Sequence, residues 1–278
     1  MNKPGRRARL LATGAALCLV IPALASIAGA AEESEAELAK KLSNPISDMA
    51  SIPFQFNWDT GVGLNEDLRY TLNIQPVVPF SIGKDWNLIG RWIMPYVSQP
   101  ILFDGGTTAA GYGDIVFSAF ISPKKSSTVW GLGPVFLLPT TTDPYLGSGK
   151  WGLGPTAVVL RQTGPWTYGA LANHIWSYSN TGDTPRSNVN QTFLQPFLAY
   201  STTTGATVTL QSESTANWEA DSGEEWTVPI NLLVSKVSRL GPFPLSVAGG
   251  VGVYVAAPDG GPDWKLRMAF TLLLPNKK

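Results

Sequence analysis

His174 is the only histidine of the 278-residue chain, and an imidazole is the side chain that most often acts as a general base. A hydrolase would need His174 to activate a serine within hydrogen-bonding distance. Ser177 follows three residues later, so in a β-strand the two side chains point to opposite faces, and the same-face neighbours of His174 are Ala172 and Trp176. A lipase or esterase therefore stays a remote alternative that requires a serine on a neighbouring strand. We assign no catalytic residue and predict that the chain is not an enzyme.

Metal-binding side chains are scarce in this sequence. One histidine and one cysteine, Cys18, do not make a structural zinc site. The acidic segments 219–225 and 259–263 could bind calcium through oxygen atoms, but neither has the full spacing of a calcium-binding loop. Solvated loop charge is the favoured interpretation, so the sequence predicts no metal and no cofactor.

The first 30 residues have the pattern of an export signal. Basic residues between positions 3 and 9 precede an apolar stretch over 10–27, and Ala28-Gly29-Ala30 matches a signal-peptidase site. Cleavage after Ala30 would remove Cys18 and four basic residues but none of the 20 acidic ones, which leaves four more acidic than basic residues. With no basic excess to neutralise phosphates, nucleic acid is not an expected partner.

The apolar residues of the remaining chain follow a period of two. Hydrophobic residues make up 44% of the chain and charged residues 14%, against about 25% charged in typical globular proteins. Beyond the signal we find no apolar run of the roughly 18 residues that a transmembrane helix needs. Instead, in the segment 69–80, Tyr70 and Leu72 share one face while Arg69 and Thr71 share the other. The pattern is typical of strands with one apolar and one polar face.

Twelve alternating segments, each of about ten residues, follow a short helix. An even number of such strands is typical of a bacterial transmembrane barrel. The helix is predicted over 35–42, with Asn44-Pro45 as its stop, inside a segment that covers 31–50. The predicted strands are 51–60, 68–80, 86–99, 114–121, 129–138, 151–160, 166–177, 190–200, 206–218, 226–235, 243–256 and 264–274.

The connections between these segments support a barrel over a soluble sandwich. Long connections alternate with short ones, as the outer loops and inner turns of a barrel do, and the long ones are acidic while the short ones are basic. The polar face carries Gly, Thr, Asn and Gln, with too little charge for a surface in water. The fold class is therefore all-β, a transmembrane antiparallel up-and-down barrel of about twelve strands with a short N-terminal helix.

Two local patterns give further expectations about the strands. The segment 130–134, Trp-Gly-Leu-Gly-Pro, recurs at 151–155, so we expect Trp and Leu of both copies to face lipid and the glycines to face inward. Proline lacks a donor for the sheet, so the prolines within predicted strands should mark bulges or strand ends. These prolines are Pro76, Pro95, Pro134, Pro155, Pro196 and Pro229.

Ten polar side chains are predicted to line the lumen, where small polar residues and glycines should accompany them. They are Asp59, Arg69, Asn73, Gln75, Arg91, Asp114, Gln211, Glu213, Lys265 and Arg267. Two interpretations remain open. Their balanced charges could line an aqueous path with weak ion selectivity. Alternatively, they could pair across the barrel and close it, since twelve strands lie between the filled interior of eight and the open channel of sixteen.

Several segments resemble a bacterial outer-membrane family of transporters similar to the meta-pathway phenol-degradation proteins, whose members are often mislabelled neuromedin U. The resemblance covers nearly all of the chain after the signal. It implies an outer-membrane barrel that passes small hydrophobic or aromatic molecules, and the family offers no agreed functional residues to transfer. The matching segments are 69–76 (Arg-Tyr-Thr-Leu-Asn-Ile-Gln-Pro), 111–114 (Gly-Tyr-Gly-Asp), 133–140 (Gly-Pro-Val-Phe-Leu-Leu-Pro-Thr), 166–174 (Trp-Thr-Tyr-Gly-Ala-Leu-Ala-Asn-His) and 257–264 (Ala-Pro-Asp-Gly-Gly-Pro-Asp-Trp).

Together these observations predict a signal peptide over 1–30, a periplasmic helical segment over 31–50 and an outer-membrane barrel over 51–278 of a Gram-negative bacterium. The predicted function is passive passage of small solutes, including hydrophobic or aromatic compounds. A closed structural or surface-binding barrel is the alternative. Expected partners are outer-membrane lipid and lipopolysaccharide, the solute and the barrel-insertion machinery. The helical segment either lies under the lumen or plugs part of it.

Overall fold

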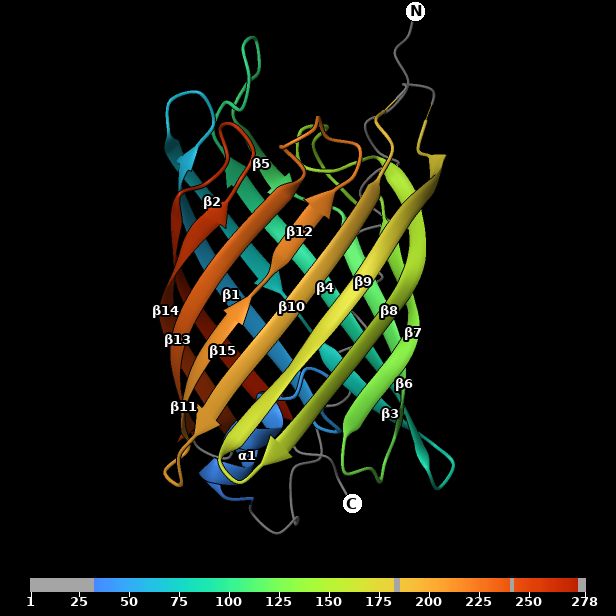
Figure 1. Ribbon diagram of the computed structural model, residues 1–278, viewed down its shortest axis with the longest axis vertical. Coiled ribbons are helices and arrows are strands. Elements are labelled where there is room, and N and C mark those ends of the chain that lie inside the picture. The colour runs from blue at the N-terminus through green and yellow to red at the C-terminus, as the bar shows by residue number, and fades with distance from the viewer. Residues whose placement is uncertain (1–32, 183–185, 241–242, 275–278) are drawn as a thin grey trace, which may run out of the picture. The chain divides into compact units, whose positions relative to one another are not determined.

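The chain forms one closed antiparallel barrel in the computed structural model, which describes residues 33–182, 186–240 and 243–274. The predicted signal peptide lies outside the described residues. Pairing of β9 with β10 closes the sheet (Figure 1). The elements are α1 (Glu35–Leu42), β1 (Ala50–Val62), β2 (Asp67–Ile74), β3 (Val77–Ile82), β4 (Trp86–Gln99), β5 (Ala109–Tyr112), β6 (Ile115–Pro123), β7 (Val129–Leu138), β8 (Lys150–Thr163), β9 (Trp166–Asn180), β10 (Asn190–Ser201), β11 (Ala206–Ser212), β12 (Ser214–Asn217), β13 (Trp226–Leu240), β14 (Phe243–Ala256) and β15 (Trp264–Leu274).

The fifteen strands make twelve passes of the barrel wall, because three passes are interrupted. β2 and β3 together form one pass, which pairs with β1 on one side and β4 on the other. β5 and β6 form a second pass, which pairs with β4. β11 and β12 form a third pass, between β10 and β13. The prediction of a twelve-stranded all-β barrel with one short N-terminal helix is confirmed.

Four of the six prolines predicted to mark bulges or strand ends lie at or opposite an interruption of the wall, but the prediction is wrong for Pro134 and Pro155, which pair inside the continuous strands β7 and β8. Pro76 separates β2 from β3, and Pro95 of β4 faces the break between β5 and β6, where its carbonyl accepts a hydrogen bond from the backbone N–H of Gly113. Pro196 of β10 lies opposite the break between β11 and β12. Pro229 marks the register shift between β13 and β14. At each of these positions the regular hydrogen bonding of the sheet is already interrupted, so the lack of a backbone N–H on proline breaks no further hydrogen bond.

The repeated Trp-Gly-Leu-Gly-Pro segments lie on the neighbouring strands β7 and β8 and meet only at their proline ends, where Pro134 is opposite Pro155. Leu132 and Leu153 are exposed on the outer face, whereas Gly131 and Gly152 are buried on the inner face, as predicted. The glycine before each proline is needed for close packing, because a Cβ at Gly133 or Gly154 would overlap a backbone oxygen of the neighbouring strand. The repeat therefore lets β7 and β8 pack closely against their neighbouring strands, although Pro134 and Pro155 donate no backbone hydrogen bond.

Substitution of Gly154 should destabilise the barrel. A Cβ there overlaps the backbone oxygen of His174, so we expect Gly154→Ala to lower the free energy of unfolding by about 1–3 kcal/mol, as overpacking does. Gly249→Ala is the matched control, because a Cβ at Gly249 meets nothing within 4 Å. Urea unfolding in lipid vesicles would measure both, and equal stabilities of the two variants would contradict the role of Gly154.

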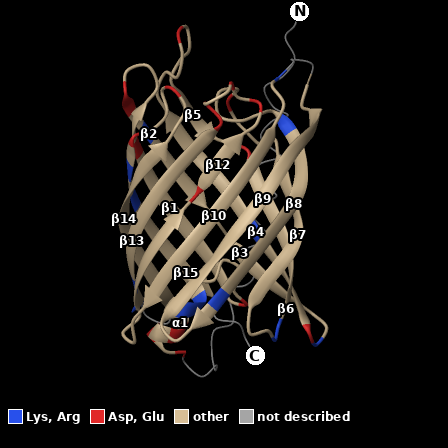
Figure 2. Cartoon of the chain, in the orientation of Figure 1, with Lys and Arg blue, Asp and Glu red and all other residues tan. Residues whose placement is uncertain are grey.

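The barrel has two unlike ends, which we call the loop end and the helix end. The connections after β1, β4, β7, β9, β12 and β14 form the loop end, and α1 lies at the opposite end (Figure 1). Acidic residues gather at the loop end, while the basic residues of the short turns lie at the helix end (Figure 2). The predicted alternation of long and short connections, with its separation of charge, is confirmed.

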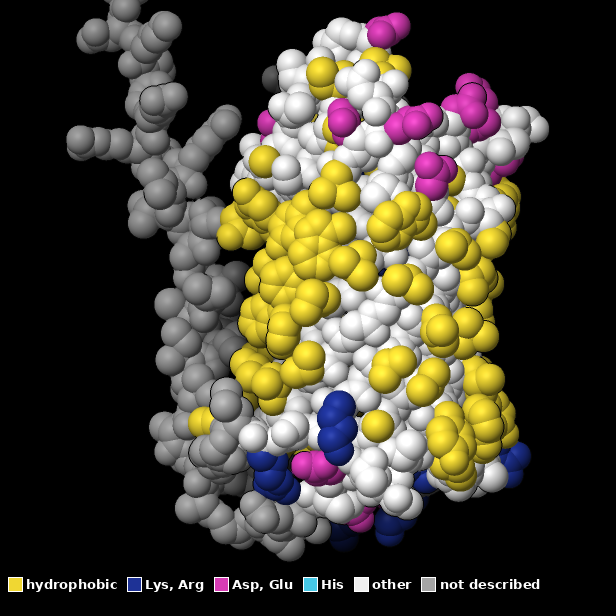
Figure 3. Space-filling model, turned by 90° about the vertical axis from the view of Figure 1, so that its left-hand side faces the viewer, with side chains coloured by type: hydrophobic (Ala, Val, Ile, Leu, Met, Phe, Trp, Pro, Cys, Tyr) yellow, Lys and Arg dark blue, Asp and Glu magenta, His cyan; other side chains and the backbone are white. Residues whose placement is uncertain are grey.

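An apolar band surrounds the barrel wall between these charged ends. Figure 3 shows hydrophobic side chains over the middle of one face, with acidic residues above and basic residues below. The outward residues of β15 are Trp264, Leu266, Met268, Phe270 and Leu272, which are 37–48% exposed although they are apolar. No helix in the described part of the chain is long and apolar enough to cross a membrane.

The inner face of the barrel has an apolar wall and a polar wall. The apolar wall is a buried cluster on β3, β4, β6, β8, β9 and β10 that includes Ile89, Phe120, Leu160 and Leu171. The expectation that small polar residues and glycines occupy the whole inner face is wrong for these strands. Ile46, from the segment before β1, packs into the same cluster and is 2% exposed, so this wall is apolar because protein, not water, covers it.

Candidate functional site

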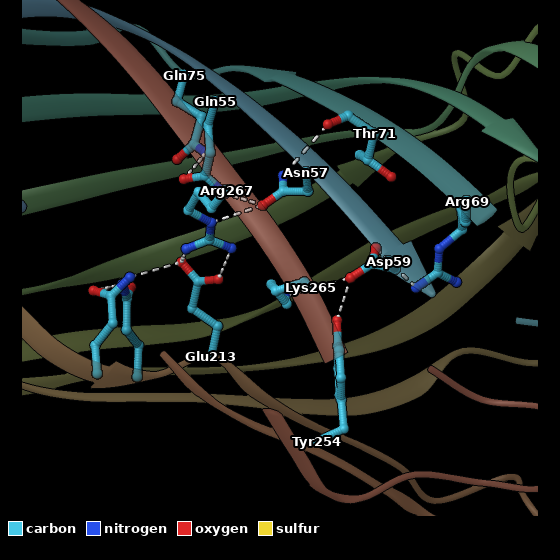
Figure 4. Close-up of polar contacts among 12 residues, drawn as sticks. Gln55, Asn57, Asp59, Arg69, Thr71, Gln75, Glu213, Tyr254, Lys265 and Arg267 are labelled. Carbon is cyan, nitrogen blue, oxygen red and sulfur yellow. Dashed lines mark hydrogen bonds and ion pairs between the residues drawn. The ribbon is translucent and has the colours of Figure 1, made fainter. Parts of the chain in front are cut away.

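A continuous chain of hydrogen bonds crosses the polar wall, and we call its members the polar belt. At its centre the guanidinium of Arg267 on β15 binds both carboxylate oxygens of Glu213, with Nη1–Oε1 at 3.0 Å and Nη2–Oε2 at 2.6 Å (Figure 4). Arg267 Nε also donates to Oδ1 of Asn57 on β1 at 2.7 Å. The polar belt consists of Gln55, Asn57, Gln75, Arg91, Gln195, Gln211, Glu213 and Arg267.

The pair formed by Arg267 and Glu213 joins strands that are not neighbours. Glu213 lies at the break between β11 and β12, and β13 and β14 separate it from β15. The inward positions of β14 at Gly250 and Gly252 have no side chain, which leaves space for Arg267 to reach across. The side chain of Arg267 is only 4% exposed. A bidentate pair of this geometry is among the stronger polar contacts in proteins.

Glutamine side chains extend the polar belt in both directions. On one side, Gln211 donates to Glu213 at 3.3 Å and Gln195 donates to Gln211 at 3.3 Å. On the other side, Gln55 donates to Oδ1 of Asn57 at 3.4 Å and Gln75 donates to Gln55 at 3.3 Å. The outer two amides approach the apolar wall, since Gln195 lies on β10 and Gln75 lies directly before Pro76 and β3.

Arg91 ends the polar belt on β4. Its Nη2 donates to Oε1 of Gln75 at 3.2 Å. Among the described residues, no carboxylate oxygen forms an ion pair with Arg91. The register places Arg91 opposite Val77, at the edge of the apolar wall. Arg91 is therefore a lumenal cation available to a passing anion.

A second group surrounds Asp59 of β1, nearer the loop end. The carboxylate accepts a hydrogen bond from the hydroxyl of Tyr254 at 2.6 Å and pairs with Arg69 Nη2 at 3.4 Å and Lys265 Nζ at 3.8 Å (Figure 4). Lys265 also lies 4.8 Å from the centroid of the Tyr254 ring. Register explains the arrangement, because Arg69 and Lys265 are the two residues directly opposite Asp59 on β2 and β15.

The structure brings most of the predicted lumen residues together but separates one. Asn73 lies on the same inner face, opposite Gln55. Asp114 does not belong to either group. Its carboxylate accepts from Ser148 N at 2.6 Å, Ser148 Oγ at 2.8 Å and Thr141 N at 3.2 Å, so it holds the connection between β7 and β8 at the loop end. Of the nine predicted lumen residues that remain, two are carboxylates and four are cations.

Sequence reasoning missed four participants: Gln55, Asn57, Gln195 and Tyr254. Alternation places Gln55 and Asn57 on the polar face of β1, and that signal was available in the sequence. Asn231 of β13 also faces inward. It is 1% exposed, and neither its amide oxygen nor its amide nitrogen has a hydrogen-bond partner among the described residues. Buried amides of this kind are normally satisfied by water or a ligand.

Residues 33–49, which we call the N-terminal segment, close the helix end of the lumen. Leu38 and Ala39 of α1 pack against Met49, Val237 and Leu273. Polar contacts also hold the segment: Lys236 Nζ pairs with Glu35 at 3.0 Å and Gln162 donates to the carbonyl of Lys40 at 2.8 Å. The segment therefore plugs part of the lumen, which was one of the two arrangements that the sequence left open.

A cavity of about 260 Å³ lies between the N-terminal segment and the polar belt. Its lining combines apolar groups with hydrogen-bonding groups, including Leu42, Pro45, Gln75, Arg91, Phe197 and Glu213. Small-molecule sites usually combine an apolar lining with a few converging polar groups. The cavity can thus hold a small molecule that has a polar end and an apolar body.

The start of α1 carries a titratable capping contact. Ser34 and Glu37 form a capping box, and the hydrogen bonds from Ser34 lower the pKa of Glu37. A pKa below that of the unfolded chain means that the helix stabilises the carboxylate. This stabilisation is complete above the ordinary pKa of glutamate and disappears as pH falls through the lowered value.

We therefore expect acidification to raise the open probability of the barrel in planar bilayers. Glu37→Gln keeps a capping side chain but removes the titration, so its open probability should change less with pH than that of the unaltered chain. Identical pH profiles for Glu37→Gln and the unaltered chain would contradict the prediction.

Comparison with solved structures places this architecture among outer-membrane barrels. An outer membrane channel from Pseudomonas putida F1 is 14% identical, with a TM-score of 0.61 over 81% of this chain and 94% of that one. This is the barrel fold of outer-membrane channels. The NanC porin (12% identity, TM-score 0.49, 81% and 100% covered) and outer membrane phospholipase A from Escherichia coli (11%, 0.43, 87% and 98%) are less similar. No family model and no curated protein matches the chain.

Proposed function

We propose that this chain is an outer-membrane channel for passive passage of small solutes that carry a negative group on a hydrophobic or aromatic body. The observation that carries the proposal is the cavity between the N-terminal segment and the polar belt, inside a closed barrel. The sequence supports the proposal through its resemblance to the transporter family similar to the meta-pathway phenol-degradation proteins. This resemblance is the reason for including aromatic compounds among the proposed solutes.

The proposed location is the outer membrane of a Gram-negative bacterium. A closed sheet leaves no unpaired edge, which is the condition for β-strands in hydrocarbon. The exposed apolar band on the outer face then contacts lipid and, near the acidic loops, lipopolysaccharide (Figure 3). The barrel-insertion machinery is the partner that this location requires. Orientation follows from the loops, with the loop end outside the cell and α1 in the periplasm.

The preference for a negative solute follows from the lumenal charges. Asp59 and Glu213 are each paired with an arginine, while Arg91 donates to the amide of Gln75 and forms no ion pair within 4 Å among the described residues. A ring of excess positive charge selects anions. The apolar wall beside Arg91, with Val77 and Ile89, would contact the hydrophobic part of the solute. An aromatic carboxylate has both features.

Ion selectivity in planar bilayers tests the proposal. Under a salt gradient, the reversal potential of the refolded full-length chain should show preference for anions, and benzoate should reduce chloride current by competing for the path. Arg91→Gln should shift the reversal potential toward cations with little loss of stability. Arg161→Gln is the matched control, because Arg161 is exposed on the outside of the barrel near the helix end. A cation preference in the unaltered chain, or equal shifts in both variants, would overturn the anion assignment.

A closed structural barrel is the second candidate function, and two observations favour it. The pair between Glu213 and Arg267 crosses part of the interior, and the N-terminal segment fills the helix end. Such a barrel would act through its acidic loops on a surface partner. The two functions differ in one measurement, since a closed barrel stays silent in bilayers even when the N-terminal segment is removed.

A further inference from the structure

His174 belongs to a second polar cluster, on the outer wall of the barrel. It faces outward from β9, and its ring Nδ1 lies 2.8 Å from Oγ1 of Thr192, the residue directly opposite on β10. Its Nε2 lies 3.0 Å from Oδ1 of Asn190. The indole N–H of Trp218 donates to the same Thr192 hydroxyl at 2.8 Å. Ser177 is not the hydroxyl that contacts His174. The hydroxyl on the neighbouring strand belongs to a threonine, Thr192, and not to a serine.

The contacts assign one arrangement of protons to this cluster. An amide oxygen only accepts hydrogen bonds, so the imidazole presents its N–H at Nε2 to Asn190. The other nitrogen, Nδ1, then carries the lone pair and accepts the hydroxyl proton of Thr192. The hydroxyl is thus hydrogen-bonded to a base whose ring is oriented by a third residue, which is the arrangement of an activated nucleophile.

We propose that Thr192, His174 and Asn190 form a catalytic site that hydrolyses carboxylic esters of membrane lipids. Thr192 is the nucleophile, His174 the general base and Asn190 a positioning residue. Polar groups on a lipid-facing wall are costly and usually have a function. This inference rests on the contacts of His174 and is independent of the lumen, because all three side chains project away from the polar belt.

The reaction balances with water as the co-reactant. Thr192 Oγ1 attacks the ester carbonyl carbon as its proton moves to Nδ1 of His174. The tetrahedral intermediate then loses the alcohol, which takes that proton, and leaves an ester between the acyl group and Thr192. Water attacks this acyl-threonine, gives its proton to Nδ1 and releases the carboxylic acid as the proton returns to Oγ1. The Trp218 N–H, already beside Oγ1, is placed to donate to the developing oxyanion.

The position of the cluster indicates the class of substrate. Trp176 and Trp218, which contact the cluster, are 51% and 47% exposed on the outer face, and Asn190 begins β10 at the loop end. Aromatic residues of this kind mark the level where the hydrocarbon meets the headgroups. Ester carbonyls of glycerolipids lie at that level. The hydroxyl therefore faces the ester linkages of lipid in the leaflet on the loop side.

Hydrolysis and covalent labelling of the refolded full-length chain in detergent micelles test the inference. We expect release of fatty acid from dioleoylphosphatidylcholine and labelling by a fluorophosphonate probe, with the adduct mapped to Thr192 by mass spectrometry. Thr192→Val, which is isosteric, should abolish both signals, and Thr192→Ser should retain them. His174→Gln should lower the rate roughly 10²–10⁴-fold, as expected for loss of a general base. Asn190→Leu should lower kcat with KM unchanged, while Asn190→Asp should restore part of kcat.

Thr60→Val is the matched control, because Thr60 also lies near the loop end of the barrel and its hydroxyl donates to the backbone oxygen of Trp264. Its hydrolysis rate should equal that of the unaltered chain. Heat-modifiable mobility on gels would show that each variant is folded. Absence of hydrolysis and labelling in the unaltered, folded chain would overturn the proposal, and so would a Thr192→Val variant as active as the unaltered chain. Bilayer conductance of Thr192→Val should be unchanged, so this outcome is separate from that of the channel.

Discussion

A chain that lacks residues 33–47 should conduct ions steadily and several-fold more strongly than the full-length chain in planar bilayers. These residues supply α1, which packs on Val237 and Leu273 inside the helix end, and Ile46, which fills the apolar wall. Their removal opens the cavity below the polar belt to the periplasmic side. The barrel wall keeps its twelve passes, because β1 begins at Ala50.

A point substitution separates plugging from a general effect of truncation. Ile46→Asp places a charge in a cluster where Ile46 is 2% exposed, so the segment should leave the lumen and conductance should rise as in the truncated chain. Glu35→Gln removes only the pair with Lys236 at the rim and should have a smaller effect. If all three chains conduct no more than the full-length chain, the polar belt alone closes the barrel and the channel proposal fails in favour of the structural barrel.

The strand faces were predictable because the period of two in the sequence is also the period of the barrel wall. Alternation placed Arg267 and Lys265 inward and Trp264 outward, and the structure agrees. The proline positions were predictable for a similar reason, since a missing donor acts locally. The helix over 35–42 was predictable with its Asn44-Pro45 stop, which again is a local signal.

Contacts between distant strands were not predictable in the same way. Whether Glu213 meets Arg267 depends on the closure of the barrel and on the empty inner face of β14 at Gly250 and Gly252, which no local pattern encodes. Asp114 has the alternation of a lumen residue, but a loop from 27 residues or more further along the chain captures its carboxylate. The apolar wall was missed because its complement, Ile46, lies outside the strands.

The same distinction applies to His174. The alternation of side chains along a single strand was enough to exclude Ser177 as the partner of His174. In the structure, Nδ1 of His174 lies beside Thr192 instead. The true partners, Thr192 and Asn190, are defined by the pairing of β9 with β10 and by which residues lie opposite one another. A search restricted to serine could not find them, since the chemistry requires a hydroxyl and an oriented base and not one residue type.

Glu213→Ala should be the most destabilising single substitution in the polar belt. It removes the carboxylate that binds two nitrogens of Arg267, and it leaves this arginine, whose side chain is 4% exposed, without its counter-charge. Loss of one partner from a buried pair costs about 3–5 kcal/mol, because the remaining charge stays desolvated. Urea unfolding in lipid vesicles, followed by tryptophan fluorescence, would measure the free energy of unfolding.

The double variant Glu213→Ala with Arg267→Leu identifies the cause of that loss. If the cost comes from an uncompensated charge, removal of Arg267 should recover much of the stability, as apolar replacement of buried pairs does. Glu219→Ala, in an exposed part of the loop end, is the control and should change stability by less than about 0.5 kcal/mol. A double variant no more stable than Glu213→Ala would show that the polar belt stabilises the barrel through its amides. Arg267 would then be available to bind the solute.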